Sequence, residues 1–237
     1  METWKLIILF ASCFFGGISV FFFKKDNTQR LKLILSFSGA YLFSITVLHL
    51  IPEVYQQTDE MIGLFILTGF LFQILLEQFS EGIEHGHVHK HEHDHYAFPF
   101  GIIISLCVHG LLEGMPLAKG HQNELVFGIV LHHIPAAFAL GSVLLQNRVG
   151  NKAIVLLLIV FALMTPIGYF LGHSIDNGTI GEIDLYFDRM MAIVIGIFLH
   201  ISTTILFESS VDHHFNLKKV IAVAAGVGIA LVGFFTA

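Results

Sequence analysis

With 237 residues, of which 55% are hydrophobic and only 13% are charged, the chain carries more apolar surface than one soluble core of this size can bury. Its formal net charge of −6 is modest and indicates no particular partner, and nucleic acid is not an expected ligand. The two cysteines, Cys13 and Cys107, each lie inside an apolar stretch, which excludes a disulfide framework and a zinc site made of thiolates. The composition therefore predicts an integral membrane protein.

Apolar runs of roughly 18 to 22 residues, long enough to cross about 30 Å of hydrocarbon, recur along the whole chain. Polar breaks divide these runs into eight predicted spans, at residues 6–23, 33–51, 61–79, 98–117, 125–145, 153–171, 190–207 and 220–235. The predicted fold is an all-α bundle of eight transmembrane helices, which occupies residues 1–237 as a single transmembrane domain.

The basic residues predict how this bundle is oriented. If the N-terminus lies outside, nine of the 12 lysines and arginines fall in loops on the cytoplasmic side. Because cytoplasmic loops are rich in Lys and Arg, both termini are predicted to lie outside. The loop after the third span is then cytoplasmic.

That loop, at about residues 80–97, contains a tract in which histidine alternates with other residues. The histidines of the tract are His85, His87, His89, His91, His93 and His95. Imidazoles on a flexible segment can capture zinc-like ions in many interchangeable arrangements, although no fixed geometry follows from the pattern. The alternative is a solvated linker whose metal affinity is incidental.

Ionisable residues within the predicted fourth span are candidates for a functional site, because burying such a side chain in a bilayer costs at least about 2.5 kcal/mol. His109 and Glu113 are four residues apart and therefore lie on one helix face. There an imidazole nitrogen and a carboxylate oxygen can converge on one cation. The alternative is that these two residues pair only to hold helices together.

The predicted fifth span adds His132 and His133, followed by Pro135. Proline has no amide hydrogen, so the Leu131 carbonyl loses its helical donor and becomes available beside the two histidines. Adjacent helical side chains point about 100° apart, so one of these histidines could be structural.

Further polar residues lie toward the ends of predicted spans and could line the mouths of a route through the bundle. They are His49 and Glu53 in the second span, Glu77, Glu81 and Glu84 at the inner end of the third, and His200 and Glu208 in the seventh. Taken singly, each could equally be an interfacial anchor or a charge at a helix end.

Several motifs in these helices carry a family resemblance. They are Ser38-Gly39 with His49-Leu50-Ile51-Pro52-Glu53, His109-x-x-x-Glu113-Gly114, His132-His133-Ile134-Pro135, Thr165-Pro166-Ile167-Gly168 and, more loosely, Phe198-Leu199-His200-Ile201. With them the chain resembles the ZIP (Zrt/Irt-like) family of metal transporters over essentially its whole length. The resemblance implies eight transmembrane helices, outward termini and a histidine-rich cytoplasmic loop after the third.

In that family the fourth and fifth helices carry the central metal site, which by position implies His109, Glu113 and His132 as ligands here. Ala136 stands where a glutamate of the fifth helix is expected. Some relatives hold a second metal, and at the corresponding positions this chain has Gly110, His133 and Thr165. We therefore expect one metal, with His133 or water completing its coordination.

These observations predict transmembrane transport of divalent transition-metal ions, with zinc uptake into the cytoplasm as the expected activity and Fe²⁺, Mn²⁺ and Cd²⁺ as other candidate ions. The metal is then cargo, and no enzyme activity or catalytic cofactor is expected. Without a phosphate-binding loop, the driving force would be the ion gradient, the membrane potential or coupled protons. The expected partners are the metal and the lipid bilayer, with a homodimer as a candidate assembly, and the expected location is a cell membrane, multi-pass, of bacterial type.

Rival interpretations remain at this point. A cation exporter should have intramembrane aspartates, which lie in loops here, and a metallohydrolase should have a His-Glu-x-x-His pattern, which the chain lacks. A membrane protein that senses or buffers metal would use the histidine tract as its working part. Deleting the tract should then remove most of its metal effect, whereas a transporter should keep some uptake.

Overall fold

The structure is a computed structural model that describes residues 3–22, 28–56, 59–80, 82, 98–118, 123–176, 184–208 and 217–236, without the side chains of 28–30, 176, 184–186 and 208. Within these ranges the chain is helical and has no strand. Among the described residues, eight helices are long and apolar enough to cross a membrane, which confirms the predicted all-α membrane bundle.

The spans follow the predicted order. Their elements are α1 (Thr3–Ile18) with the 3₁₀ turn η1 (Ser19–Phe21), α2 (Thr28–Ile45) continuing through the π-helix η2 (Thr46–Leu50) into α3 (Ile51–Val54), α4 (Ile62–Ser80), α5 (Phe100–Gly114) with η4 (Met115–Ala118), α6 (Asn123–Gln146), α7 (Asn151–Asp176), α8 (Asp184–Glu208) and α9 (Leu217–Thr236).

The second span extends beyond its predicted end at residue 51, because the helix continues through Pro52 to Val54. A proline ring clashes with the carbonyl four residues earlier in a regular helix. The wider π turn at Thr46–Leu50 ends two residues before Pro52 and accommodates it.

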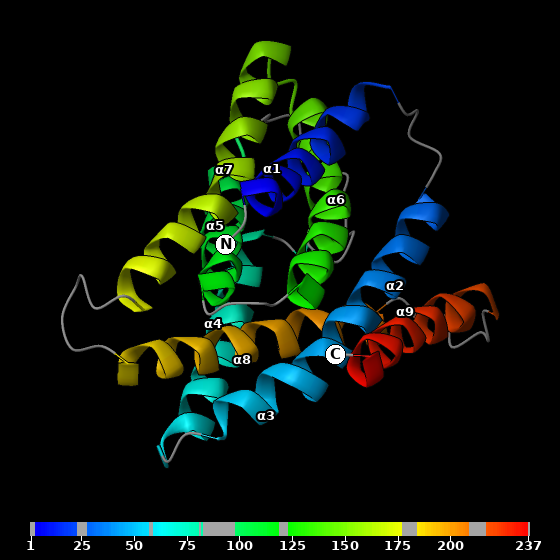
Figure 1. Cartoon of the computed structure of the whole chain (residues 1–237). Helices are drawn as coiled ribbons and strands as arrows, with labels where there is room; N and C mark the ends of the chain where they lie inside the picture. The colour runs from blue at the N-terminus through cyan, green and yellow to red at the C-terminus, as the bar shows by residue number, and fades with distance from the viewer. Residues whose placement is uncertain are drawn as a thin grey trace.

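The helices form two groups (Figure 1). In one group α1 packs against α6 and α7, and α5 packs against α7. In the other, α4 packs against α8, and α2 packs against α8 and α9. Contacts of α2 with α6 and of α4 with α5 join the groups.

Helices α5 and α7 approach so closely that their backbones touch. A Cβ atom added at Gly168 would lie 1.9 Å from the carbonyl oxygen of Leu111, and one added at Gly114 would lie 2.1 Å from that of Thr165. Both distances are far below van der Waals contact, so glycine is required at each position. This contact fixes the position of the helix that carries His109 and Glu113.

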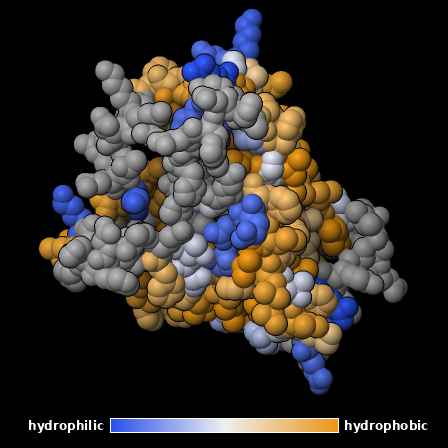
Figure 2. Space-filling model, turned by 180° about the vertical axis from the view of Figure 1, so that it is seen from behind, coloured by the Kyte–Doolittle hydropathy of each residue, from blue (hydrophilic) through white to orange (hydrophobic). Residues whose placement is uncertain are grey.

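The outer surface of the bundle is broadly apolar, as Figure 2 shows for one face. On α4, Leu67, Leu71 and Leu75 are 53%, 56% and 55% exposed and recur every four residues, so they form one stripe. In water such a stripe would be costly, whereas in a bilayer it meets lipid.

Asp59 links the turn before α4 to the start of α8. The Arg189 Nε–H donates to Oδ2 of Asp59 at 2.8 Å, and the Met61 backbone N–H donates to Oδ1 at 2.9 Å. These hydrogen bonds, that from Arg189 first, lower the pKa of Asp59 below its ordinary value of 3.8. A carboxyl group with a lowered pKa stabilises the fold while it is ionised and loses that contribution as the pH falls.

We therefore expect Asp59→Asn to lower the thermal unfolding midpoint at neutral pH. The difference from the wild type should close as the pH falls below 3.8, where the wild-type carboxyl also becomes neutral. Thermal unfolding midpoints measured in detergent at neutral pH and below pH 3.8 test this. The control is Glu60→Gln at the exposed neighbouring residue, which should match the wild type. A difference that widened toward acid pH would contradict it.

Candidate metal centre

His109 and Glu113 lie on one face of α5, as their spacing predicts. Both side chains are 0% exposed, and Nε2 of His109 lies 3.1 Å from Oε1 of Glu113. A buried imidazole and carboxylate at this separation can bind one cation together, since two ligand atoms on a tetrahedral zinc are about 3.3 Å apart.

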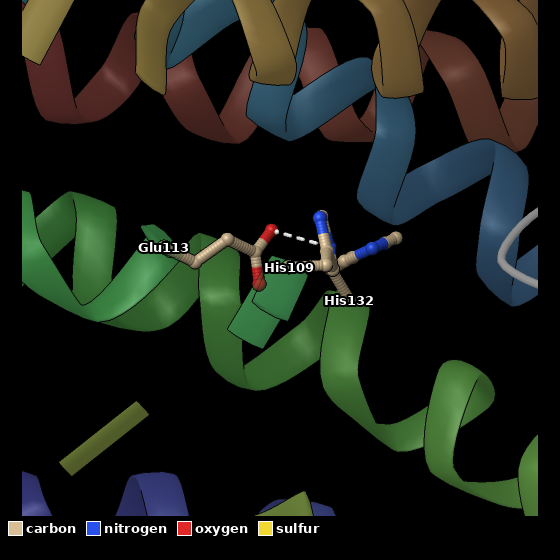
Figure 3. Close-up of side chains that lie close together, drawn as sticks. All are labelled: His109, Glu113 and His132. Atoms are coloured by element: carbon tan, nitrogen blue, oxygen red, sulfur yellow. Dashed lines mark ion pairs between the residues drawn. The ribbon is translucent and has the colours of Figure 1, made fainter. Parts of the chain in front are cut away.

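His132 of α6 completes a group of three. One ligand atom each from His109, Glu113 and His132 lies within 4.8 Å of the other two. The rings of His109 and His132 meet edge to face, 5.8 Å apart, and His132 is also 0% exposed. Figure 3 shows the three side chains close together, His109 and Glu113 on α5 and His132 on α6, with the ion pair between His109 and Glu113 dashed. Two imidazoles and one carboxylate are a donor set that suits zinc-like ions.

His133 contacts the other oxygen of the same carboxylate. Its Nε2 forms an ion pair with Oε2 of Glu113, and its side chain is 1% exposed. Its ring packs 5.8 Å from that of Phe161 on α7. The two adjacent histidines of α6 therefore both lie near Glu113, His132 within the group that contains His109 and His133 on the second carboxylate oxygen.

Pro135 lies inside α6, which runs without a break from Asn123 to Gln146. The next residue, Ala136, is 1% exposed and offers no ligand atom. A Cβ atom at Gly110 would lie 3.6 Å from Oγ1 of Thr165, which is also 1% exposed, so these two positions are neighbours across α5 and α7. Neither supplies a carboxylate or an imidazole.

The remaining predicted residues lie elsewhere. His200 of α8 pairs with Glu77 of α4, with Nε2 and Oε2 3.4 Å apart. His49 lies in η2 against the ring of Phe234 on α9, and Glu53 lies in α3. None of these belongs to the His109, Glu113 and His132 group.

Some predicted residues fall outside the part of the chain that the structure describes. These are Glu81, Glu84, His85, His87, His89, His91, His93, His95 and the side chain of Glu208. Gln73 of α4 was not predicted from the sequence, although its side chain is 0% exposed. The sequence feature that could have indicated it is an amide side chain four residues before Glu77 in an otherwise apolar run.

Comparison with known proteins adds independent evidence. The sequence model of a family described as "ZIP Zinc transporter" matches residues 97–233. The chain is 28% identical over 148 residues to Protein zntD of Dictyostelium discoideum, an alignment that covers 58% of this chain and 21% of that protein.

Two further relatives are similar in other stretches. Zinc transporter ZIP9 of Micropogonias undulatus is 31% identical over 120 residues, which cover 48% of this chain and 39% of that protein. Zinc transporter 1 of Oryza sativa subsp. japonica is 29% identical over 146 residues, which cover 55% and 41% respectively. The chain thus covers less than half of the length of each of these relatives.

Proposed function

The chain belongs to the ZIP zinc transporter family, and from that premise we propose that it carries divalent metal ions across a membrane, with zinc as the principal cargo and the cytoplasm as the destination. The observation that supports this best is the group of His109, Glu113 and His132, fully buried between helices of a membrane bundle. Ionisable residues at such a position usually mark an ion pathway, because their burial is costly unless they bind something. Their nitrogen and oxygen donors favour zinc over magnesium or calcium.

We propose a single transmembrane domain over residues 1–237, with both termini outside and the histidine tract in the cytoplasm. The distribution of lysine and arginine supports this orientation. A bacterial cell membrane and a homodimeric assembly belong to the same proposal. The cytoplasmic tract of His85 to His95 would capture ions after they leave the bundle.

The route through the bundle is also a proposal. Ions would approach past His49 and Glu53 and lose water to the buried group. They would leave along residues near the inner ends of helices, namely Glu77, Glu81, Glu84, His200 and Glu208. Without a nucleotide-binding motif in the sequence, movement would follow the metal gradient, the membrane potential or coupled protons.

The experiment that tests transport is uptake of radioactive zinc into vesicles that contain the purified protein, with empty vesicles as the reference. Zinc accumulation above the reference, reduced by competing Fe²⁺, Mn²⁺ or Cd²⁺ in a defined order, is the expected result. Metal binding without accumulation of any of these ions would overturn the transport proposal.

Within this centre His133 would hold Glu113 rather than bind metal. With Oε2 engaged by His133, Glu113 offers only Oε1 to a cation. A carboxylate that binds through one oxygen suits tetrahedral zinc, whereas larger ions that prefer oxygen often take both. His133 would thereby favour zinc over manganese.

We expect His133→Ala to lower the ratio of zinc to manganese uptake by about tenfold, because it releases the second carboxylate oxygen. His133→Gln, whose amide can still donate a hydrogen bond, should retain most of the ratio. This ratio is measured as the uptake of zinc and of manganese when the two ions compete. An unchanged ratio in the alanine variant would contradict the positioning role, and complete loss of metal binding would make His133 a direct ligand.

A further inference from the structure

A second polar cluster lies inside the bundle, between α4 and α8. Its members are Gln73 and Glu77 of α4 and His200 of α8. These helices supply no residue to the group of His109, Glu113 and His132. The cluster is therefore separate from that centre.

The two helices are held together by a contact that needs no polar residue. A Cβ atom at Gly69 would lie 1.9 Å from the carbonyl oxygen of Ile193, and one at Gly196 would lie 2.0 Å from that of Ile66. The helix backbones therefore touch, and close packing accounts for their association. An ionisable pair one to two turns further along is not required to hold them, and it is costly inside a bilayer.

The cluster extends directly from this glycine contact. Gln73 follows Gly69 by four residues, Glu77 follows Gln73 by four, and His200 follows Gly196 by four, so all three continue the faces on which the helices meet. His200 contacts two residues of α4. Its ring packs edge to face on Phe70 at 5.0 Å, and its Nε2 lies near Glu77. Gln73 lies between Phe70 and Glu77 on α4 and is 0% exposed.

The distance between the His200 imidazole and the Glu77 carboxylate suits two ligands of one cation. Nε2 of His200 and Oε2 of Glu77 are 3.4 Å apart. This separation is close to the spacing of about 3.3 Å between two ligands on one tetrahedral zinc with bonds of about 2.0–2.1 Å, so both atoms could bind one cation. The imidazole also packs edge to face on the Phe70 ring, which restricts its orientation.

From this geometry we propose that Glu77 Oε2, His200 Nε2 and the amide oxygen of Gln73 form a second divalent-cation site, distinct from the centre on α5 and α6. It offers one imidazole where the first centre offers two, so it should bind zinc more weakly. Glu77 is 22% exposed, whereas Glu113 is 0% exposed, so ions should exchange more readily here. Its contribution to transport rests on the proposed function, whereas ion binding there does not.

The test must separate this site from other histidines, and a cysteine ligand does so because a cadmium–thiolate bond has its own ultraviolet charge-transfer band. His200→Cys is introduced into the full chain with Cys13 and Cys107 replaced by alanine, and cadmium is titrated into the purified protein. We expect a charge-transfer band, and adding Glu77→Gln should weaken cadmium affinity by about tenfold or more. The histidine tract is present in both proteins and contributes no thiolate.

Two further variants serve as a control and as a reciprocal test. Ser202→Cys places a thiol on the opposite side of α8, where its cadmium response should not depend on Glu77. Reciprocally, Glu77→Cys should give a band that His200→Ala weakens, which covers the case in which His200→Cys fails to fold.

The second site would be overturned if the cadmium band of His200→Cys is not weakened by adding Glu77→Gln and that of Glu77→Cys is not weakened by adding His200→Ala. This outcome is distinct from failure of the transport proposal, which is decided by vesicle uptake alone. Failure of zinc uptake with the partner-dependent bands intact would leave the second site standing.

Discussion

Replacing Glu113 by alanine is expected to reduce zinc uptake to the level of empty vesicles while the protein still inserts into the membrane. Glu113 contributes an oxygen to the group with His109 and His132 and also pairs with His133, so its removal takes away the negative charge on which three imidazoles converge. A divalent ion would then leave water for neutral donors alone, which is unfavourable inside a bilayer. Glu113→Gln should fail similarly, since it keeps the shape and removes the charge.

The matched control for the histidine ligands is His173→Ala. His173 is an exposed residue of α7 that stacks on Tyr169 outside the buried group, so its loss should leave uptake close to that of the wild type. His109→Ala should match Glu113→Ala. Retained uptake in both His109→Ala and Glu113→Ala, with normal insertion, would show that the metal pathway lies elsewhere.

Gly168→Ala is expected to destabilise the fold by about 3 kcal/mol or more, because its methyl group would collide with the Leu111 carbonyl at 1.9 Å. The collision involves backbone, which cannot rotate away, so α7 must move from α5. The expected results are a lower thermal midpoint and a smaller fraction of monodisperse protein in size-exclusion chromatography.

Gly228→Ala supplies the control for this substitution. Gly228 lies on α9, where an added Cβ meets no atom within 4 Å. Alanine favours helix over glycine by about 1 kcal/mol in a peptide, so this variant should be unchanged or slightly more stable. Equal midpoints for the two variants would show that the α5–α7 contact is looser than the structure has it.

The fold could be predicted from the sequence because the bilayer imposes one dominant rule, the length of an apolar run. His109 and Glu113 were predicted to lie together for a similarly local reason, since four residues make about one helical turn. Contacts between helices are a different matter. That His133 reaches the second oxygen of Glu113 depends on how α6 sits against α5, which no spacing within one helix reveals.

Two other features escaped prediction for identifiable reasons. Gln73 is uncharged and lies in an apolar run, so it did not stand out until the structure showed that its side chain is fully buried. The π turn before Pro52 is a change of helical register, and the residue pattern of the second span does not distinguish it from a regular helix.

The short length of α4 sets a condition on the membrane. Its 19 residues extend about 28 Å, slightly less than a typical hydrocarbon thickness of about 30 Å. The 26 residues of α7 extend about 39 Å and can absorb extra thickness by tilting. Glu77 lies only three residues before the end of α4, so a thicker bilayer would make its surroundings more apolar. The span Phe100–Ala118 is equally short at 19 residues, but His109 lies at its middle. Lipid chain length should therefore alter the environment of the α4–α8 cluster before it affects the centre on α5 and α6.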